Sequence, residues 1–238
     1  MNAWPDFVFP NEKGFKSSLL DDYLKAGYYR MQHLLFTTHR TQLSINNEEL
    51  PVFWLRLLIN DIKENKEAVA IRKKCAPFNL TVNNAGITIE VNELYGSYTS
   101  VIDFEAAETC SSYLHDAFIE NPFDSKMVQI RDENKLIANG YFDVGKNSIA
   151  GILNFYDPAY KKYSLGKYLM LKKLDFARSN NMQYYYTGYI STATTKFDYK
   201  LFPDVSAIEV FLPIEEIWVP YQTLGKAKLA EYFDKNIR

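Results

Sequence analysis

Cysteine and long apolar runs are both scarce in this sequence, and each scarcity excludes a class of protein. The 238 residues contain two cysteines, Cys75 and Cys110, too few and too far apart for a disulfide framework or a metal-ligand spacing. No segment approaches the roughly 18 uninterrupted apolar residues that a membrane span needs. The first residues lack the basic start and apolar run of a signal peptide. These absences predict a reduced, cytoplasmic protein without membrane contact.

A strong excess of one charge sign is also absent, since 27 basic and 29 acidic residues give a net charge of −2. This balance argues against a general nucleic-acid coat, but it permits one local basic groove. Aromatic residues, in contrast, are abundant, with 18 Tyr and 16 Phe. Tyrosine brings a hydroxyl into apolar surroundings, which suits a cleft for polar or nucleotide ligands.

The stretch 148–190 carries the strongest structural signal. Residues 148–156 (SIAGILNFY) are mostly β-branched, aromatic or apolar, which predicts a buried strand. The Asp-Pro pair at 157–158 ends that strand, because proline cannot continue a ladder. A loop over 159–164, a helix over 165–179 and a second strand over 183–190 follow. Strand, short helix and strand predict a right-handed crossover between two parallel strands.

Positive charge gathers at this crossover. Residues 159–178 contain six basic side chains and one acidic side chain, Asp175. Ser164 is expected to cap the helix, whose first N–H groups favour an anion such as phosphate. An anionic ligand is therefore predicted at the helix start, although a solvated lysine face on an ordinary helix explains the same pattern.

The remaining elements predict an α+β protein. Residues 1–88 are expected to form a small N-terminal α/β subdomain, and 89–238 a second domain. The elements expected from periodicity and turn signals are helices at 15–26, 90–99, 104–118 and 224–233, strands of a small N-terminal sheet at 28–36 and 52–59, and strands at 78–82, 127–131, 136–144 and 205–212. Helices, an antiparallel meander, a helical crossover and a parallel strand resemble the order of the GNAT acyltransferase fold.

Several motifs resemble one family, the arginyl-tRNA–protein transferases together with the bacterial enzymes that transfer leucine to acidic protein N-termini. FYDPAYKKYSLGKYLMLKKLDFA at 155–177 is similar to the family's Y/F-D-P strand end, S-L-G and helix. YYYTGYI at 184–190 resembles its Y-x-x-G-Y strand, and TKFDYKLFP at 195–203 its K-M-x-Y-K…P segment, with Phe197 in place of methionine. NELYGSYTSV at 92–101 and LKAGYYRM at 24–31 are similar to its L-Y-x-x-Y and G-F/Y-R-R segments.

The resemblance implies a GNAT-like enzyme that moves arginine or leucine from aminoacyl-tRNA to the N-terminal amine of an acceptor protein or peptide, with the charged tRNA as co-substrate and no other cofactor. The family's cysteine cluster after Arg30 is missing from FTTHRTQLS at 36–44, so no metal is expected. Asp157 and Tyr189 are expected to be catalytic. The expected substrate-binding residues are Tyr28, Arg30, Tyr156, Lys161, Lys162, Ser164, Leu165, Gly166, Lys167, Tyr186, Gly188, Lys196, Tyr199 and Lys200.

Two other functions stay open. One is an acetyl-CoA-dependent GNAT N-acetyltransferase, although KKYSLGK at 161–167 has a single glycine where close approach to a pyrophosphate favours more. The other is a relative that binds tRNA or peptide without catalysis. Simpler roles also stay open for single residues, since Asp157 before proline suits a turn and Ser164 suits a helix cap.

Overall fold

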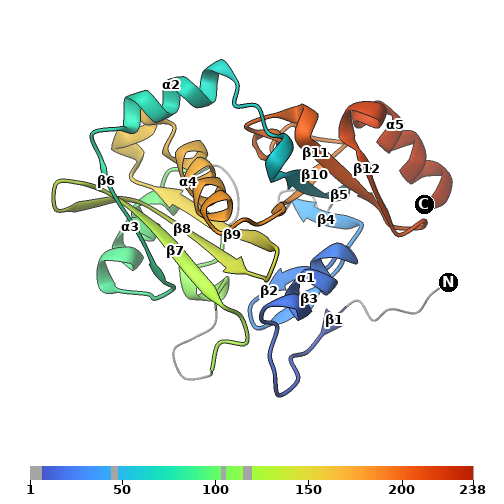
Figure 1. Cartoon of the computed structure of the whole chain (residues 1–238), viewed down its shortest axis with the longest axis horizontal. Helices are drawn as coiled ribbons and strands as arrows, with labels where there is room; N and C mark the ends of the chain where they lie inside the picture. The colour runs from blue at the N-terminus through green and yellow to red at the C-terminus, as the bar shows by residue number, and fades with distance from the viewer. Residues whose placement is uncertain (1–6, 44–47, 103–105, 115–119, 238) are drawn as a thin grey trace.

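The strand Tyr184–Ser191 (β10) lies near the middle of a large mixed sheet that organises the chain. We describe the fold from a computed structural model that covers residues 7–43, 48–102, 106–114 and 120–237. In the sheet β10 pairs antiparallel with β5 (Glu48–Leu58) on one side and parallel with β9 (Ser148–Tyr156) on the other. The described residues thus form a mixed α+β structure, as predicted (Figure 1).

Within the described residues, nine strands make up this sheet. From one edge to the other the order is β12 (Ile217–Pro220), β11 (Ile208–Leu212), β5, β10, β9, β8 (Lys135–Val144), β7 (Ser125–Asp132) and β6 (Asn79–Asn84), and β4 (Arg40–Leu43) pairs with β5. Strands β7, β8 and β9 form the predicted antiparallel meander. Glycine- and asparagine-containing turns between them had indicated it.

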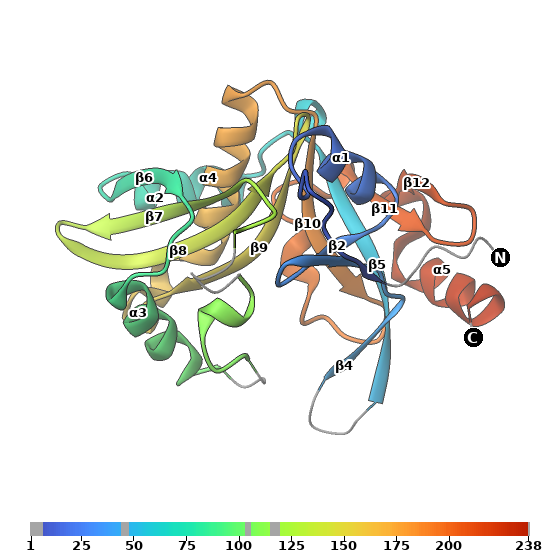
Figure 2. The same cartoon turned by 90° about the horizontal axis from the view of Figure 1, so that it is seen from below.

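A second sheet is small and lies near the N-terminus. It contains β1 (Phe7–Val8), β3 (Leu34–Phe36) and β2 (Tyr29–Met31), with α1 (Ser18–Lys25) beside it in Figure 2. The single strand predicted at 28–36 is therefore two strands, because Gln32 turns the chain at φ 54°. The prediction that 52–59 joins this small sheet is wrong, since β5 pairs with β10 and β11 of the large sheet. The boundary expected between residues 88 and 89 stays a prediction.

The helices cover both faces of the meander. The helix α4 (Leu165–Ser179) packs on β8 and β9 from one side, and α3 (Ile89–Thr99) packs on them from the other (Figure 2). Apolar residues of α4 such as Leu169 and Leu174 are fully buried in the largest core cluster. The crossover from β9 through α4 to β10 thus has the predicted parallel arrangement.

Some predicted helices differ from the structure. The helix Lys66–Cys75 (α2) was not predicted, and it packs against α4. Within the expected helix at 104–118, the described residues 106–114 contain only a 3₁₀ turn, Cys110–Ser112. The expected loop at 159–164 is mostly the 3₁₀ helix Pro158–Tyr163. The tail helix α5 is longer than expected, at Tyr221–Asn236.

Candidate functional site

The two parallel strands separate after a short paired segment, and the site lies in the opening between them. Pairing ends at Tyr186 and Ala150, after which β9 and β10 no longer bond to each other. Gly188 has a left-handed φ of 103° at a bulge in the pairing of β10 with β5. Its N–H donates to the Tyr29 hydroxyl at 2.7 Å. Glycine tolerates this backbone at no steric cost, so it permits the strand to bend away from β9.

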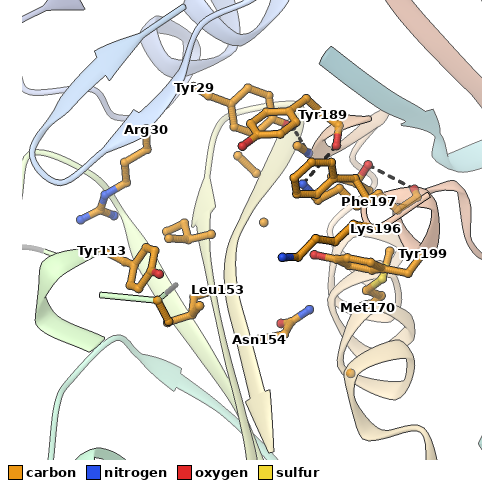
Figure 3. A pocket seen from close by; sticks show the side chains of 18 of the residues that line it. Tyr29, Arg30, Tyr113, Leu153, Asn154, Met170, Tyr189, Lys196, Phe197 and Tyr199 are labelled. Atoms are coloured by element: carbon orange, nitrogen blue, oxygen red, sulfur yellow. Dashed lines mark hydrogen bonds between the residues drawn. The ribbon is translucent and has the colours of Figure 1, made fainter. Parts of the chain in front are cut away.

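A cavity of about 1400 Å³ occupies this opening (Figure 3). Residues 151–154 of β9 and 187–189 of β10 line it, together with the start of α4 and the segment 194–200. The size exceeds that of a typical small-molecule pocket. A large ligand, or parts of two ligands, therefore fits there.

Most of the predicted site residues meet at this cavity. Those that line it are Arg30, Tyr156, Lys161, Ser164, Gly166, Lys167, Gly188, Tyr189, Lys196, Tyr199 and Lys200. Those that do not are Tyr28, Asp157, Lys162, Leu165 and Tyr186. Tyr28, Leu165 and Tyr186 are buried in the hydrophobic core instead.

Asp157 caps the turn after β9, a structural role that its position before proline had suggested. Its Oδ1 accepts from the Ala159 N–H at 2.9 Å, and its Oδ2 forms an ion pair with Lys135 at 2.6 Å. Burial raises the pKa of the Asp157 carboxyl, but these two hydrogen bonds outweigh it and hold the pKa below the ordinary value. A carboxylate of low pKa outside the cavity lining is a weak base for an amine substrate.

The start of α4 leaves its first N–H groups uncapped. Ser164 adopts the left-handed conformation at φ 54°, and its side chain makes no capping hydrogen bond, so its predicted role as an N-cap is wrong. The helix nevertheless begins at Leu165, with Gly166 and Lys167 in its first turn. Uncapped N–H groups and the positive end of the helix dipole can bind a phosphate.

The basic side chains near α4 are less exposed to a ligand than the sequence suggests. Lys167 pairs with Glu67 at 2.6 Å, Lys172 with Asp175 at 3.1 Å, and Arg178 with Glu64. Lys161 and Lys162 are the two exposed lysines of the 3₁₀ helix before α4. Lys74 of α2 donates to the Lys162 carbonyl, which brings a further cation to this surface.

The cavity itself is cationic. Six basic side chains line it, and within the part of the chain that the structure describes no Asp or Glu does: Arg30, Lys161, Lys167, Lys173, Lys196 and Lys200. Figure 3 shows Lys196 extending into the cavity. This arrangement favours ligands with negative charge.

Besides Lys167, which pairs with Glu67, other basic side chains of the lining also have partners or a lowered pKa. Arg30 donates to the buried Asp143 at 2.7 Å and to Ser125 at 2.8 Å, so it ties β2 to β7 and β8. Lys200 lies beside the rings of Tyr189 and Phe197, with its Nζ 3.1 Å from the Tyr189 carbonyl oxygen. Burial lowers the pKa of Lys200 to about 7.

An aromatic wall lies next to Lys200. The Tyr189 ring meets Trp54 at 5.2 Å and Phe197 at 5.1 Å between ring centroids, and its hydroxyl lies 3.2 Å from the Thr41 hydroxyl. Two further lining residues, Tyr156 and Tyr98, have ring centroids 5.4 Å apart. Such rings can stack on nucleobases.

Among the lining residues that were not predicted, Asn154, Lys173 and Tyr29 have side chains that form hydrogen bonds. Asn154 interrupts an otherwise apolar strand, and Lys173 interrupts the apolar stripe at 165, 169 and 177 of α4, so the sequence did contain a signal for both. Tyr29 was missed because its neighbour Tyr28 is chemically identical, and which of them faces the cavity depends on where β2 begins.

Among the described residues no group of three or more His, Cys, Asp or Glu side chains could hold a metal ion. None of the helices described is both long and apolar enough to span a bilayer.

Comparisons with known proteins agree with the motifs. Residues 90–203 match the family model described as "Arginine-tRNA-protein transferase, C terminus". Arginyl-tRNA–protein transferase 1 of Arabidopsis thaliana is 33% identical over 105 residues, which are 42% of this chain and 16% of that protein. Aspartate/glutamate leucyltransferase of Paracoccus denitrificans is 24% identical over 171 residues, 66% of this chain and 60% of that protein. The chain thus spans less than two thirds of either relative.

Similar solved structures include FemX, with a TM-score of 0.44, 9% identity and coverage of 74% of this chain and 61% of that one. Another is L-PGS from Bacillus licheniformis, with a TM-score of 0.41, 10% identity and coverage of 73% and 50%.

Proposed function

Because residues 90–203 match the family model of the arginyl-tRNA–protein transferase C terminus, we propose that this chain moves an amino acid from a charged tRNA to the N-terminal amine of an acceptor protein or peptide. The resemblance found in the sequence is confirmed by the family match and by relatives named for arginyl and for leucyl transfer. We further propose that the enzyme is cytoplasmic and uses no cofactor besides the aminoacyl-tRNA.

One observation carries this proposal, namely the cationic cavity where β9 and β10 separate beside the uncapped start of α4. This is the place where a GNAT-like fold receives an acyl donor, and the meander, crossover and parallel strand support such a fold here. In this arrangement the phosphates of the tRNA end meet the first N–H groups of α4 and the exposed Lys161. The aminoacyl ester then lies in the strand opening, near Tyr189 and Lys200.

The reaction is aminolysis of an ester. The α-amine of the acceptor has a pKa of about 8, so a useful fraction is neutral at pH 7. Its nitrogen attacks the ester carbon, a C–N bond forms, and the C–O bond to the ribose breaks. The ribose oxygen takes up the proton that the amine loses. The enzyme has to orient the two substrates and stabilise the oxyanion, and no covalent enzyme intermediate is needed.

The lining residues suit these tasks. Lys196 and Lys200 bring positive charge to the acyl end of the cavity, where it can meet an acidic first residue of the acceptor. Lys200 has a pKa of about 7, so it can also exchange a proton with the amine. Tyr189 is the second residue that we place beside the reacting atoms, rather than Asp157, which does not line the cavity.

An acetyl-CoA-dependent N-acetyltransferase is the alternative, because the uncapped α4 start would also receive a pyrophosphate. A thermal-shift comparison of leucyl-tRNA, arginyl-tRNA and acetyl-CoA separates the two enzymes, and we expect stabilisation by an aminoacyl-tRNA only. Stabilisation by acetyl-CoA alone would favour the alternative. Binding of tRNA without transfer to a peptide would indicate a relative that has lost catalysis.

A further inference from the structure

A buried lysine reaches the floor of the cavity from the middle of α4. The side chain of Lys173 is 1% exposed. Its Nζ donates to the Tyr141 carbonyl at 2.7 Å, to the Asn154 Oδ1 at 2.7 Å and, more weakly, to the Leu153 carbonyl at 3.5 Å. An ammonium group has three N–H donors and no acceptor, so these contacts account for all three.

The contact with Lys173 fixes the orientation of the Asn154 side chain. The atom that faces an ammonium has to be the carbonyl oxygen, because a second donor there would be repelled. The Nδ2 group therefore points the other way. Asn154 lines the cavity, and in Figure 3 its carboxamide stands opposite Lys196 and Tyr199. No acceptor in the described part of the chain bonds to this Nδ2, so its two N–H groups are available to a ligand.

The neighbouring strand is shaped to admit this pair. Gly140 of β8 lies directly across from Asn154 of β9. A Cβ at residue 140 would lie 2.5 Å from the Asn154 Oδ1 and 3.1 Å from the Lys173 Cε. Any side chain there would thus displace the hydrogen bond between the two residues. Glycine at this position lets Asn154 and Lys173 approach the backbone of β8 closely, although glycine has a low β propensity.

Burial of an ammonium group is itself expensive. It lowers the pKa of Lys173 to about 7, although Asp143 acts in the opposite direction. A methionine would fill the same space without that cost. The presence of a buried ammonium group beside the cavity points to a role at the site.

We propose that Lys173 is a positioning residue which holds the Asn154 Nδ2 as a hydrogen-bond donor to the carbonyl oxygen of the aminoacyl ester. The proposal rests on the function proposed above. When the acceptor amine attacks the ester carbon, the electron pair of the C=O bond moves onto that oxygen, and the Nδ2 stabilises the resulting charge. As the C–O bond to the ribose breaks, the pair returns and the carbonyl of the new peptide bond forms.

The variant Asn154→Asp tests this role most sharply. The carboxylate can still pair with Lys173, so the fold is retained, but it presents an acceptor to the cavity in place of a donor. Removal of one oxyanion donor typically lowers kcat about 100-fold or more. We expect that loss in peptide transfer, with KM for aminoacyl-tRNA within about threefold of wild type and an unchanged or higher thermal midpoint. Asn134→Asp, at an exposed turn away from the cavity, is the matched control and should transfer normally.

The variant Lys173→Met tests the positioning step. Without the ammonium the carboxamide is free to rotate, so kcat should fall about tenfold or more while KM changes little. Lys172→Met, the next residue on α4 but outside the cavity lining, should keep its kcat. If Lys173→Met fails to fold, the Asn154→Asp result decides alone.

The outcomes separate two failures. An active wild type whose Asn154→Asp variant keeps its kcat would overturn this inference alone. The inference would also be overturned if Asn154→Asp lost kcat only together with thermal stability and tRNA affinity. Such a combined loss would show that the cavity had collapsed. An inactive wild type would overturn the proposed function and this inference with it.

Discussion

A buried hydrogen bond joins the Gly188 N–H to the Tyr29 hydroxyl at the strand opening, and its removal gives a quantitative prediction. In Tyr29→Phe the Gly188 N–H loses the hydroxyl that it reaches at 2.7 Å, within a buried environment. The phenyl ring can still stack on Trp54, at 4.2 Å between centroids. A buried donor left without a partner costs about 1–3 kcal/mol. The free energy of unfolding should fall by that amount, which corresponds to about 2–4 °C in Tm per kcal/mol for a chain of this size.

Urea denaturation and thermal melts measure this change, and the transfer assay shows whether the opening is disturbed. The matched control is Tyr23→Phe, a half-buried tyrosine whose ring packs edge-on against Phe15 and whose hydroxyl bonds to nothing in the described chain. The control should stay within about 0.5 kcal/mol of wild type. Equal stability of Tyr29→Phe and wild type, or an equal loss in both variants, would refute the idea that this hydroxyl supports the bulge at Gly188.

Three further predictions concern the charged residues. The double variant Lys161→Ala and Lys162→Ala should bind aminoacyl-tRNA more weakly. The slope of log affinity against log salt concentration should become shallower by about 0.7 for each lost phosphate contact. A binding titration with an unchanged slope would contradict this prediction. The variant Arg30→Met leaves the Asp143 carboxylate buried without its ion pair. Urea denaturation should therefore show a free energy of unfolding lower by about 3–5 kcal/mol. A decrease below about 1 kcal/mol would be inconsistent with a buried ion pair. The pKa of Lys173 is about 7 in the folded chain and 10.5 for an exposed lysine. Between these pH values the unfolded chain binds more protons than the folded chain. The free energy of unfolding should therefore rise with pH from 7 to 10. Lys173→Met should show a shallower rise, and identical pH slopes would show that the lysine keeps an ordinary pKa.

The sequence predicted the crossover well because its signals are local. An apolar strand, a proline stop and a helix with apolar residues four apart specify β9 and α4 within a residue or two. The antiparallel meander followed from turn residues for the same reason. The helix α2 was missed because its charged residues, Arg72 among them, obscure a buried face made of Ala68, Ile71 and Cys75.

Non-local pairing explains the remaining errors. The strand β5 was placed in a small N-terminal sheet, but it pairs with β10, more than 120 residues further along the chain. Nothing in the pattern of either strand specifies that partner. The predicted cap at Ser164 is wrong because this residue ends the preceding 3₁₀ helix in a left-handed conformation, and its side chain makes no capping hydrogen bond.

The site was predicted at the level of its location and less well at the level of single residues. The motif residues Gly188, Lys196 and Lys200 line the cavity, and their role in binding substrate stays a prediction. Charge counting overstated the exposed basic surface, because Lys167 and its neighbours pair with carboxylates from α2 and from α4 itself. An ion pair with a carboxylate from another helix cannot be predicted from the linear sequence.

The central claim is that the cationic cavity transfers an amino acid from tRNA to a protein N-terminus. Its most direct measurement is incubation of the chain with leucyl- or arginyl-tRNA and peptides that begin with Asp, Glu, Arg or Lys, followed by tandem mass spectrometry of each peptide. We predict one added residue on the α-amine of the peptides with an acidic first residue, and none when that amine is acetylated. Peptides that stay unmodified with both charged tRNAs, while the same tRNAs support a known transferase, would contradict the claim.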